Sequence, residues 1–164
     1  MLFKISEYVD VKKKAEQLGF DIPTGIALLP QNFDIATSKG QLVHESTTQT
    51  VRVLWRQNGI IETALEHEED KIPTVAEKSL DWVGPTIFIS ALYLSQNSKL
   101  VSLAIDIIAN YLADFFRGIP KRDRKIKISF ITETKDGCYK RIEYEGPPEK
   151  LRASIKEIQK ISNE

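Results

Sequence analysis

The chain has 164 residues, 41% of them hydrophobic and 28% charged, which is the length and composition of a globular domain with a sizeable core. Lysine plus arginine and aspartate plus glutamate each number 23, so the formal net charge is zero. A neutral chain has no overall field to attract nucleic acid or anionic lipid. We therefore expect a single domain over residues 1–164 that binds no nucleic acid.

The cysteine content and the amino terminus both favour a cytoplasmic protein. Cys138 is the only cysteine, so no disulfide can form within the chain. The first residues lack the basic start and unbroken apolar run of a signal peptide. The sequence contains no recognisable glycine-rich phosphate loop or catalytic triad, so it indicates neither a cofactor nor catalytic residues.

A first helix is predicted near the amino terminus. Ser6 is placed to cap it, and Gly19, directly after Leu18, is placed to end it in a left-handed conformation. The basic triplet at residues 12–14 is more simply a solvated helix face than a phosphate site, because no glycine-rich loop or aromatic residue accompanies it.

The following segment alternates between apolar runs and turns. Residues 25–30 form a short apolar run between turn signals, which predicts a buried strand, and residues 31–40 form a loop where function is often found. Thr47 to Gly59 fits either a helix that ends at Asn58-Gly59 or a strand that enters a hairpin there. Its apolar spacing favours the helix, and residues 60–65 then read as a strand.

The two histidines, His44 and His67, both have acidic neighbours in sequence. Histidine and carboxylate together are legitimate ligands for zinc or manganese, which makes a metal-dependent enzyme an alternative interpretation. Neither spacing matches a compact metal-binding motif, and the acidic run 66–70 reads more simply as a solvated loop. We therefore predict no metal site.

The central segment, residues 83–117, is the longest apolar stretch and is compatible with a buried core or with a membrane. Pro85 and the polar residues at 95–99 interrupt it, and Asp106 and Asp114 lie within its second part. A spanning helix needs about 20 mostly apolar residues, and a carboxylate at mid-bilayer costs on the order of 3 kcal/mol. The core interpretation is therefore favoured, although basic residues follow the segment as they would in a membrane protein.

Within this segment we predict a short helix over Thr86–Leu94 and a long one over Leu100–Arg117, ended by Gly118. One polar stripe marks the long helix, because its polar residues recur at every fourth position. The stripe consists of Ser102, Asp106, Asn110 and Asp114. It is either a solvent-facing strip or the candidate site at which a partner binds.

The carboxyl-terminal part has the clearest local pattern. Residues 126–133 and 138–145 alternate between apolar and polar side chains around Asp136-Gly137, which predicts a β-hairpin with one apolar face. Glu149 to Ile161 then keeps helical spacing and predicts a closing helix.

The order of apolar helix, basic loop, strand, Asp-Gly turn, strand and closing helix over Thr86–Ile161 resembles the small effector-associated constant component proteins of bacterial conflict systems. The stretches Leu29–Phe33 and Ala109–Phe116 also look like those of uncharacterised small bacterial proteins. This resemblance implies an accessory or adaptor role and carries no active-site residues.

Together these observations predict an α+β fold, in which a small sheet that includes the carboxyl-terminal hairpin packs on the long central helix. The predicted function is non-enzymatic contact with a protein partner or with a second copy, through the polar stripe or through the edge of the hairpin. A metal-dependent enzyme using His44 and His67 and a membrane-associated protein are the alternatives.

Overall fold

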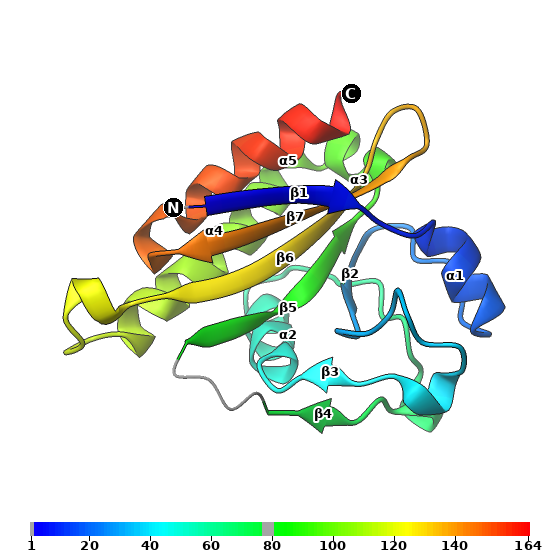
Figure 1. The fold of residues 1–164 in the computed structure, drawn as a ribbon, viewed down its shortest axis with the longest axis horizontal. Coiled ribbons are helices and arrows are strands. Elements are labelled where there is room, and N and C mark those ends of the chain that lie inside the picture. The colour runs from blue at the N-terminus through cyan, green and yellow to red at the C-terminus, as the bar shows by residue number, and fades with distance from the viewer. Residues whose placement is uncertain (1, 77–80) are drawn as a thin grey trace.

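The computed structural model describes residues 2–76 and 81–164, and its centre is a mixed five-stranded sheet (Figure 1). The strands lie in the order β1-β7-β6-β5-β2. Only β5 and β6 run parallel to each other; the other neighbouring pairs are antiparallel. The strand bounds are Leu2–Glu7 for β1, Ile26–Leu29 for β2, Trp82–Ile89 for β5, Ile126–Glu133 for β6 and Tyr139–Gly146 for β7. The predicted α+β class is confirmed.

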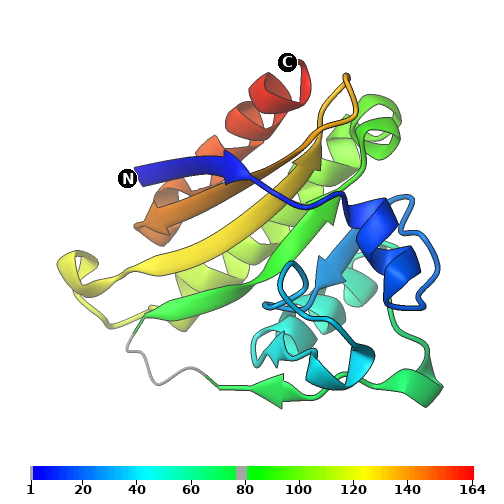
Figure 2. The same cartoon turned by 45° about the vertical axis from the view of Figure 1, so that its right-hand side comes forward.

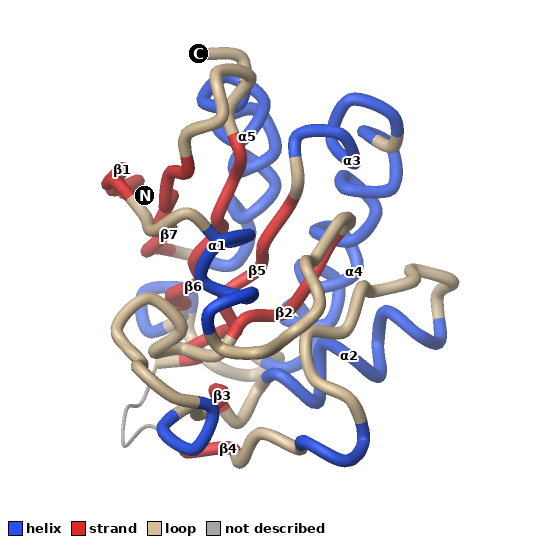
Figure 3. Tube along the Cα trace, turned by 90° about the vertical axis from the view of Figure 1, so that its right-hand side faces the viewer, coloured by secondary structure: helices blue, strands red, loops and turns tan. Residues whose placement is uncertain are grey.

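Beside this sheet, β3 (His44–Glu45) and β4 (Thr74–Val75) form a short parallel pair. The helices are α1 (Val11–Gln17), α2 (Thr48–Gln57), α3 (Ala91–Gln96), α4 (Ser98–Phe115) and α5 (Ser154–Ser162). Figure 3 shows α2, α4 and α5 on one side of the sheet, and the loops that follow β2 on the other.

The core consists of two apolar clusters, one on each face of the sheet. On the helix face, alternate residues of the hairpin point inward, so that Ile128 pairs with Tyr144 and Phe130 with Ile142. Helix α4 adds seven buried residues to this cluster, and α2 adds Trp55, whose indole N–H donates to the Ala104 carbonyl at 3.1 Å. The second cluster fills the other face over β2 and β5 with side chains from α1 and the loops.

The parallel pairing of β5 and β6 explains why the longest helix lies where it does. Parallel neighbours need a crossover connection, and here α3 and α4 provide it. The crossover breaks at Asn97, as the polar residues there indicated, and Gly118 follows the end of α4 with a φ of 86°. The predicted long helix and the predicted hairpin, with Gly137 in its turn, are therefore confirmed.

The structure differs from expectation at several segments. The first residues form an edge strand on β7, and Asp10 instead of Ser6 caps α1 by accepting from the Lys13 N–H at 3.0 Å. Thr86–Ile89 belongs to a strand, because it pairs with β6, and only the part from Ala91 is helical. Residues 60–65, predicted as a strand, form no strand, although the Thr63 N–H donates to the Ile26 carbonyl at 2.7 Å. The closing helix starts as a 3-10 segment, η4 (Pro148–Ala153), before α5.

Other sequence expectations are met. β2 is buried along its whole length, and residues 48–57 form the helix that the apolar spacing favoured over a hairpin strand. Among the helices in the described ranges, none is long and apolar enough to cross a membrane.

Replacing Ile108 by aspartate tests the placement of α4. Ile108 is fully buried, so the substitution leaves a carboxylate in the core without a partner and should lower the free energy of unfolding by at least about 4 kcal/mol. Ala113→Asp is the matched control, because Ala113 is an exposed residue of the same helix. We expect denaturant unfolding to show a near-normal Ala113→Asp variant. An Ile108→Asp variant of wild-type stability would contradict the buried position.

Candidate interaction surface

The outer side of α4 carries apolar side chains that nothing in the described part of the chain covers fully. Leu100, Leu103 and Phe115 are 39%, 42% and 48% exposed, and Tyr111 is half-buried. Their spacing places them along one side of the helix, with the buried Ile107 between Leu103 and Tyr111. We call Leu100, Leu103, Tyr111 and Phe115 the α4 ridge. Most apolar residues of α4 pack in the core, but this side of the helix presents an apolar strip to solvent.

The aromatic end of the ridge is locally packed. The rings of Tyr111 and Phe115 lie 5.9 Å apart between centroids, and the ring of Phe115 meets that of Phe116 edge to face at 5.0 Å. Because Phe116 is buried in the core, Phe115 rests on a fixed base while nearly half of its surface stays exposed. Such a supported aromatic side chain loses little conformational entropy on contact with a partner.

The predicted polar stripe runs beside this ridge, and the structure joins two of its members to η4. Arg152 donates from Nε to the Asp106 carboxylate and from Nη2 to the Asn110 side-chain oxygen, both at 2.8 Å. The contact ties η4 to α4, so these two stripe residues have an intramolecular role. The helical spacing of the closing segment did not indicate this contact.

The remaining stripe residues are not joined to Asp106 and Asn110. Asp114 pairs with Arg117 at 2.5 Å one helical turn later, and both side chains are largely exposed. Ser102 lies in a shallow groove between α4 and α5, next to Lys99 and Leu103. The apolar ridge was not predicted, because in the sequence its side chains are indistinguishable from those of the core face of the same helix.

The edge of the hairpin, the second candidate contact surface, is not free. β1 pairs with β7 and β5 pairs with β6, so both edges of the hairpin are internal to the sheet. The exposed edge on that side is β1 instead.

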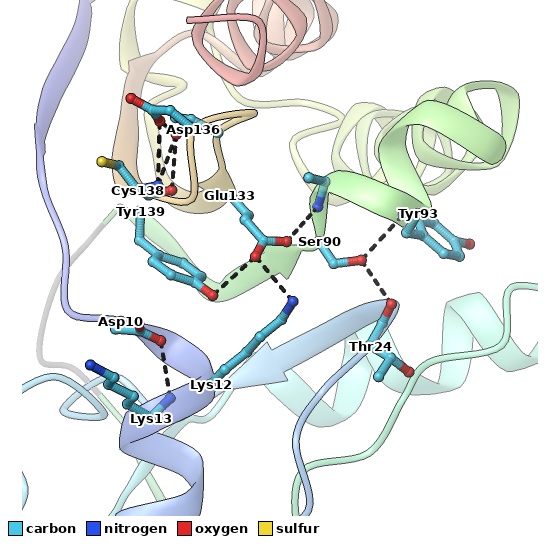
Figure 4. A network of polar contacts seen from close by, with 12 residues as sticks. Asp10, Lys12, Lys13, Thr24, Ser90, Tyr93, Glu133, Asp136, Cys138 and Tyr139 are labelled. Atoms are coloured by element: carbon cyan, nitrogen blue, oxygen red, sulfur yellow. Dashed lines mark hydrogen bonds and ion pairs between the residues drawn. The ribbon is translucent and has the colours of Figure 1, made fainter.

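A saturated polar cluster lies at the carboxyl ends of β5 and β6 (Figure 4). The Glu133 carboxylate accepts from the Ala91 N–H at 3.0 Å and from the Tyr139 hydroxyl at 3.1 Å, and it pairs with Lys12 Nζ at 3.0 Å. These partners come from α3, β7 and α1. Lys12, predicted to face water, therefore helps to hold the amino-terminal helix against the sheet.

The protonation of this cluster favours a structural role. Burial raises the pKa of Glu133, but the bonds from Ala91 and Lys12 more than offset it and hold the pKa below its usual value. Burial, helped by the charge of Glu133, raises the pKa of the Tyr139 phenol. At neutral pH the carboxylate is ionised and the phenol protonated, so neither group is poised to exchange a proton near neutrality.

Neighbouring groups in Figure 4 complete local turns and caps. The Ser90 hydroxyl accepts from the Tyr93 N–H at 3.2 Å and donates to the Thr24 carbonyl at 2.7 Å, which caps α3 and fastens it to the start of β2. Cys138 is exposed in the hairpin turn, where its N–H donates to Thr134 Oγ1 at 3.0 Å.

The two histidines pair with different carboxylates. His44 is fully buried, with Nε2 3.0 Å from Glu66 Oε1, whereas His67 lies at the surface, with Nε2 3.1 Å from Asp21 Oδ2. Over residues 2–76 and 81–164, no three histidine, cysteine, aspartate or glutamate side chains come together in a way that could hold a metal ion.

His44 instead belongs to a chain of polar contacts that fastens β3 to α2. Arg52 Nη2 lies 3.3 Å from the Glu66 oxygen that meets His44, and its Nε donates to Glu62. Burial raises the pKa of Glu66, but the hydrogen bond with His44 and the charge of Arg52 more than offset it and hold the pKa below its usual value. Glu66 is therefore a carboxylate stabilised in its ionised form by folding.

No family model, no curated protein and no solved structure matches this chain.

The lowered pKa of Glu66 predicts a defined pH dependence of stability. A carboxyl whose pKa falls on folding stabilises the protein at any pH above its pKa in the unfolded chain, here near 4.5. This contribution is lost as the pH drops through the pKa of the folded state. Glu66→Gln should therefore reduce the free energy of unfolding at pH 7 by about 1–3 kcal/mol. The difference from wild type should shrink below pH 4.5.

Urea unfolding curves at several pH values measure this difference. Glu68→Gln is the control, because Glu68 is an exposed residue of the same acidic run. A Glu66→Gln deficit that is independent of pH would contradict the assignment of this carboxylate as an ionised partner.

Proposed function

We propose that this protein is a non-enzymatic accessory protein of the cytoplasm that associates with a second copy of itself through the α4 ridge. The observation that carries the proposal is the exposure of Leu100, Leu103 and Phe115 on the helix that otherwise forms the centre of the core. An accessory role is also what the sequence resemblance implies.

The ridge has the shape and chemistry of a helix-pairing surface. α4 has 18 residues and is therefore about 27 Å long, which offers several turns of contact to a neighbouring helix. Its apolar strip is bordered on one side by the polar stripe, so a buried centre would have a polar rim. Pairing would bury three half-exposed large side chains from each copy. Each Å² of apolar surface removed from water in this way contributes about 25 cal/mol to the free energy of association.

Charge complementarity selects a second copy as the occupant. If two α4 helices pair antiparallel about a twofold axis near Ile107, Lys99 of one copy comes close to Asp114 of the other, because the two positions lie at nearly equal distances from Ile107 on opposite sides. The same symmetry places Leu103 opposite Tyr111. Since the chain has zero formal net charge, two copies do not repel each other overall.

The present partner of Asp114 does not prevent this exchange. Its pair with Arg117 joins two side chains that are 72% and 81% exposed, and such a surface pair contributes little to stability. Asp114 can therefore turn toward Lys99 of a second copy at small cost.

A charge-swap series tests the dimer and its geometry together. Lys99→Glu places two acidic groups at each end of the interface, and Asp114→Lys places two basic groups there. Each single variant should weaken dimerisation by roughly tenfold, and the double variant should recover it, because opposite charges then face each other again. Sedimentation equilibrium over a range of protein concentrations measures the dissociation constants.

Two outcomes would overturn this proposal. A wild-type chain that stays monomeric at every concentration removes the homotypic contact and leaves a different protein as the only occupant. A dimer whose affinity is unchanged in both single variants places the contact elsewhere. Glu157→Lys on α5 is the matched control, since it alters one charge on another helix of the same layer.

A further inference from the structure

On the side of the sheet away from α4 lies a polar cavity of about 310 Å³. Figures 1 and 2 show no helix of the described residues over β1, β7 and β6 on this side, whereas α1 and the loops after β2 lie beside β2. The cavity opens at the boundary between these two regions. Its walls come from β5, β6, β7, β3 and the loop after β2, the loop in which the sequence analysis placed possible function.

An irregularity in β5 shapes the cavity floor. Val83 pairs with Lys127 and Thr86 with Ser129, so three steps along β5 match two along β6. The extra residue brings both Val83 and Thr86 to the cavity side, whereas in a regular strand they would face opposite sides. Pro85 lies in the irregular part, where a missing N–H costs no ladder hydrogen bond.

Gly84, also in the irregular part, has no room for a side chain. A Cβ there would lie 2.6 Å from the Trp82 ring and 2.9 Å from Ile128. Glycine therefore allows the backbone of β5 to pack closely against Trp82 and Ile128 at the irregular step.

Ser129 is oriented so that it can only donate to a ligand. Its oxygen accepts from Nε and from Nη2 of Arg141 at 3.2 and 3.1 Å. A hydroxyl oxygen has two lone pairs and one proton, so these two bonds leave the O–H free. Ser129 is only 5% exposed, and a ligand in the cavity that reaches this hydroxyl must present an acceptor to it.

Thr86 adds a second hydroxyl beside the first. It lies opposite Ser129 in the parallel ladder, lines the cavity and is 8% exposed. Two neighbouring hydroxyls and the Arg141 guanidinium together match the two oxygens of one carboxylate.

The charges of the cavity are separated. At the β6–β7 side, Lys127 and Arg141 both pair with Glu143, at 3.3 and 3.5 Å, so two cations and one carboxylate leave one net positive charge. On the opposite wall β3 contributes Glu45, which is 6% exposed. A carboxylate accepts several hydrogen bonds at once, so Glu45 can accept from a ligand beside the contact that it already makes.

We propose that this cavity binds a small zwitterion, a free α-amino acid. The ligand carboxylate accepts from the hydroxyls of Ser129 and Thr86 and from Arg141, and the ligand ammonium group donates to Glu45. A ligand with both charges matches both ends of the cavity. Inorganic phosphate would bring further negative charge toward Glu45 and Glu143, and a neutral sugar has no charge to complement either end of the cavity.

The test is an NMR titration of the ¹⁵N-labelled full chain with each of the twenty free amino acids, up to about 10 mM, which detects a millimolar Kd. We expect at least one of them to shift the amide signals of residues 83–86 and 127–129. The N-acetyl and the carboxamide derivatives of that amino acid each lack one charge, and each should bind at least about tenfold more weakly.

Two substitutions locate the site on this cavity. Thr86→Val and Ser129→Ala each remove one hydroxyl and should weaken binding about tenfold. Thr132→Val is the matched control, because Thr132 is a buried hydroxyl of β6 on the opposite face of the sheet, and it should leave binding unchanged. The spectrum of each variant also shows whether it folds. If one hydroxyl variant does not fold, binding by the other one tests the site.

The inference is overturned if none of the amino acids shifts these signals. It is equally overturned if phosphate or glucose shifts them more strongly than any amino acid, or if the Thr86→Val variant binds as tightly as wild type. The cavity lies across the sheet from the α4 ridge, so amino-acid binding and dimerisation are tested independently of each other.

Discussion

The parallel pairing of β5 with β6 is the constraint on which the rest of the structure depends. Because these strands cannot be joined by a tight turn, the chain must cross one face of the sheet between them, and the crossover places α4 there. The apolar content of α4 then follows, since a helix in that position must fill the space between the sheet, α2 and η4. One side of the same helix is not fully covered by these elements, and this leaves the α4 ridge exposed.

The two faces of the sheet have different consequences for function. On the helix face, the hairpin contributes Phe130 and Ile142 to a continuous apolar core. On the opposite face, the apolar cluster lies over β2, β5, the carboxyl end of β6 and the start of β7, and further along β6 and β7 this face carries charged groups. The Glu133 cluster fastens α1 and α3 to the sheet at the carboxyl ends of β5 and β6. The exposed apolar side chains of α4 and the polar cavity therefore lie on opposite sides of the sheet.

Local patterns in the sequence predicted local structure well. The alternation around Asp136-Gly137, the helical spacing of α2 and α4, and the turn residues bounding β2 each determine an element through neighbours in sequence. β1 and β5 were not predicted as strands, because their pairing partners are distant: Phe3 lies opposite Tyr144, and Ile87 opposite Phe130. A short apolar run such as residues 86–89 fits a helix or a strand equally well until a neighbouring strand is known.

The candidate site was predictable only in part, for a related reason. The polar stripe on α4 was visible because its residues recur at every fourth position. Its contact with Arg152 was not, because Arg152 lies 46 positions after Asp106 and 42 after Asn110. The exposed ridge could not be separated from the core face, since both are apolar and only the packed neighbours distinguish them. The cavity was invisible for the same reason: its residues come from five segments that meet only in the fold.

The most direct test of the account is an isotope-filtered NOE experiment on an equimolar mixture of ¹³C-labelled and unlabelled chains, which detects only contacts between copies. Antiparallel pairing of α4 about Ile107 predicts intermolecular NOEs between the Leu103 methyl groups of one copy and the Tyr111 ring of the other. Intermolecular NOEs that lie instead at the exposed edge β1, or the absence of any such NOE at concentrations where the chain is dimeric, would contradict it.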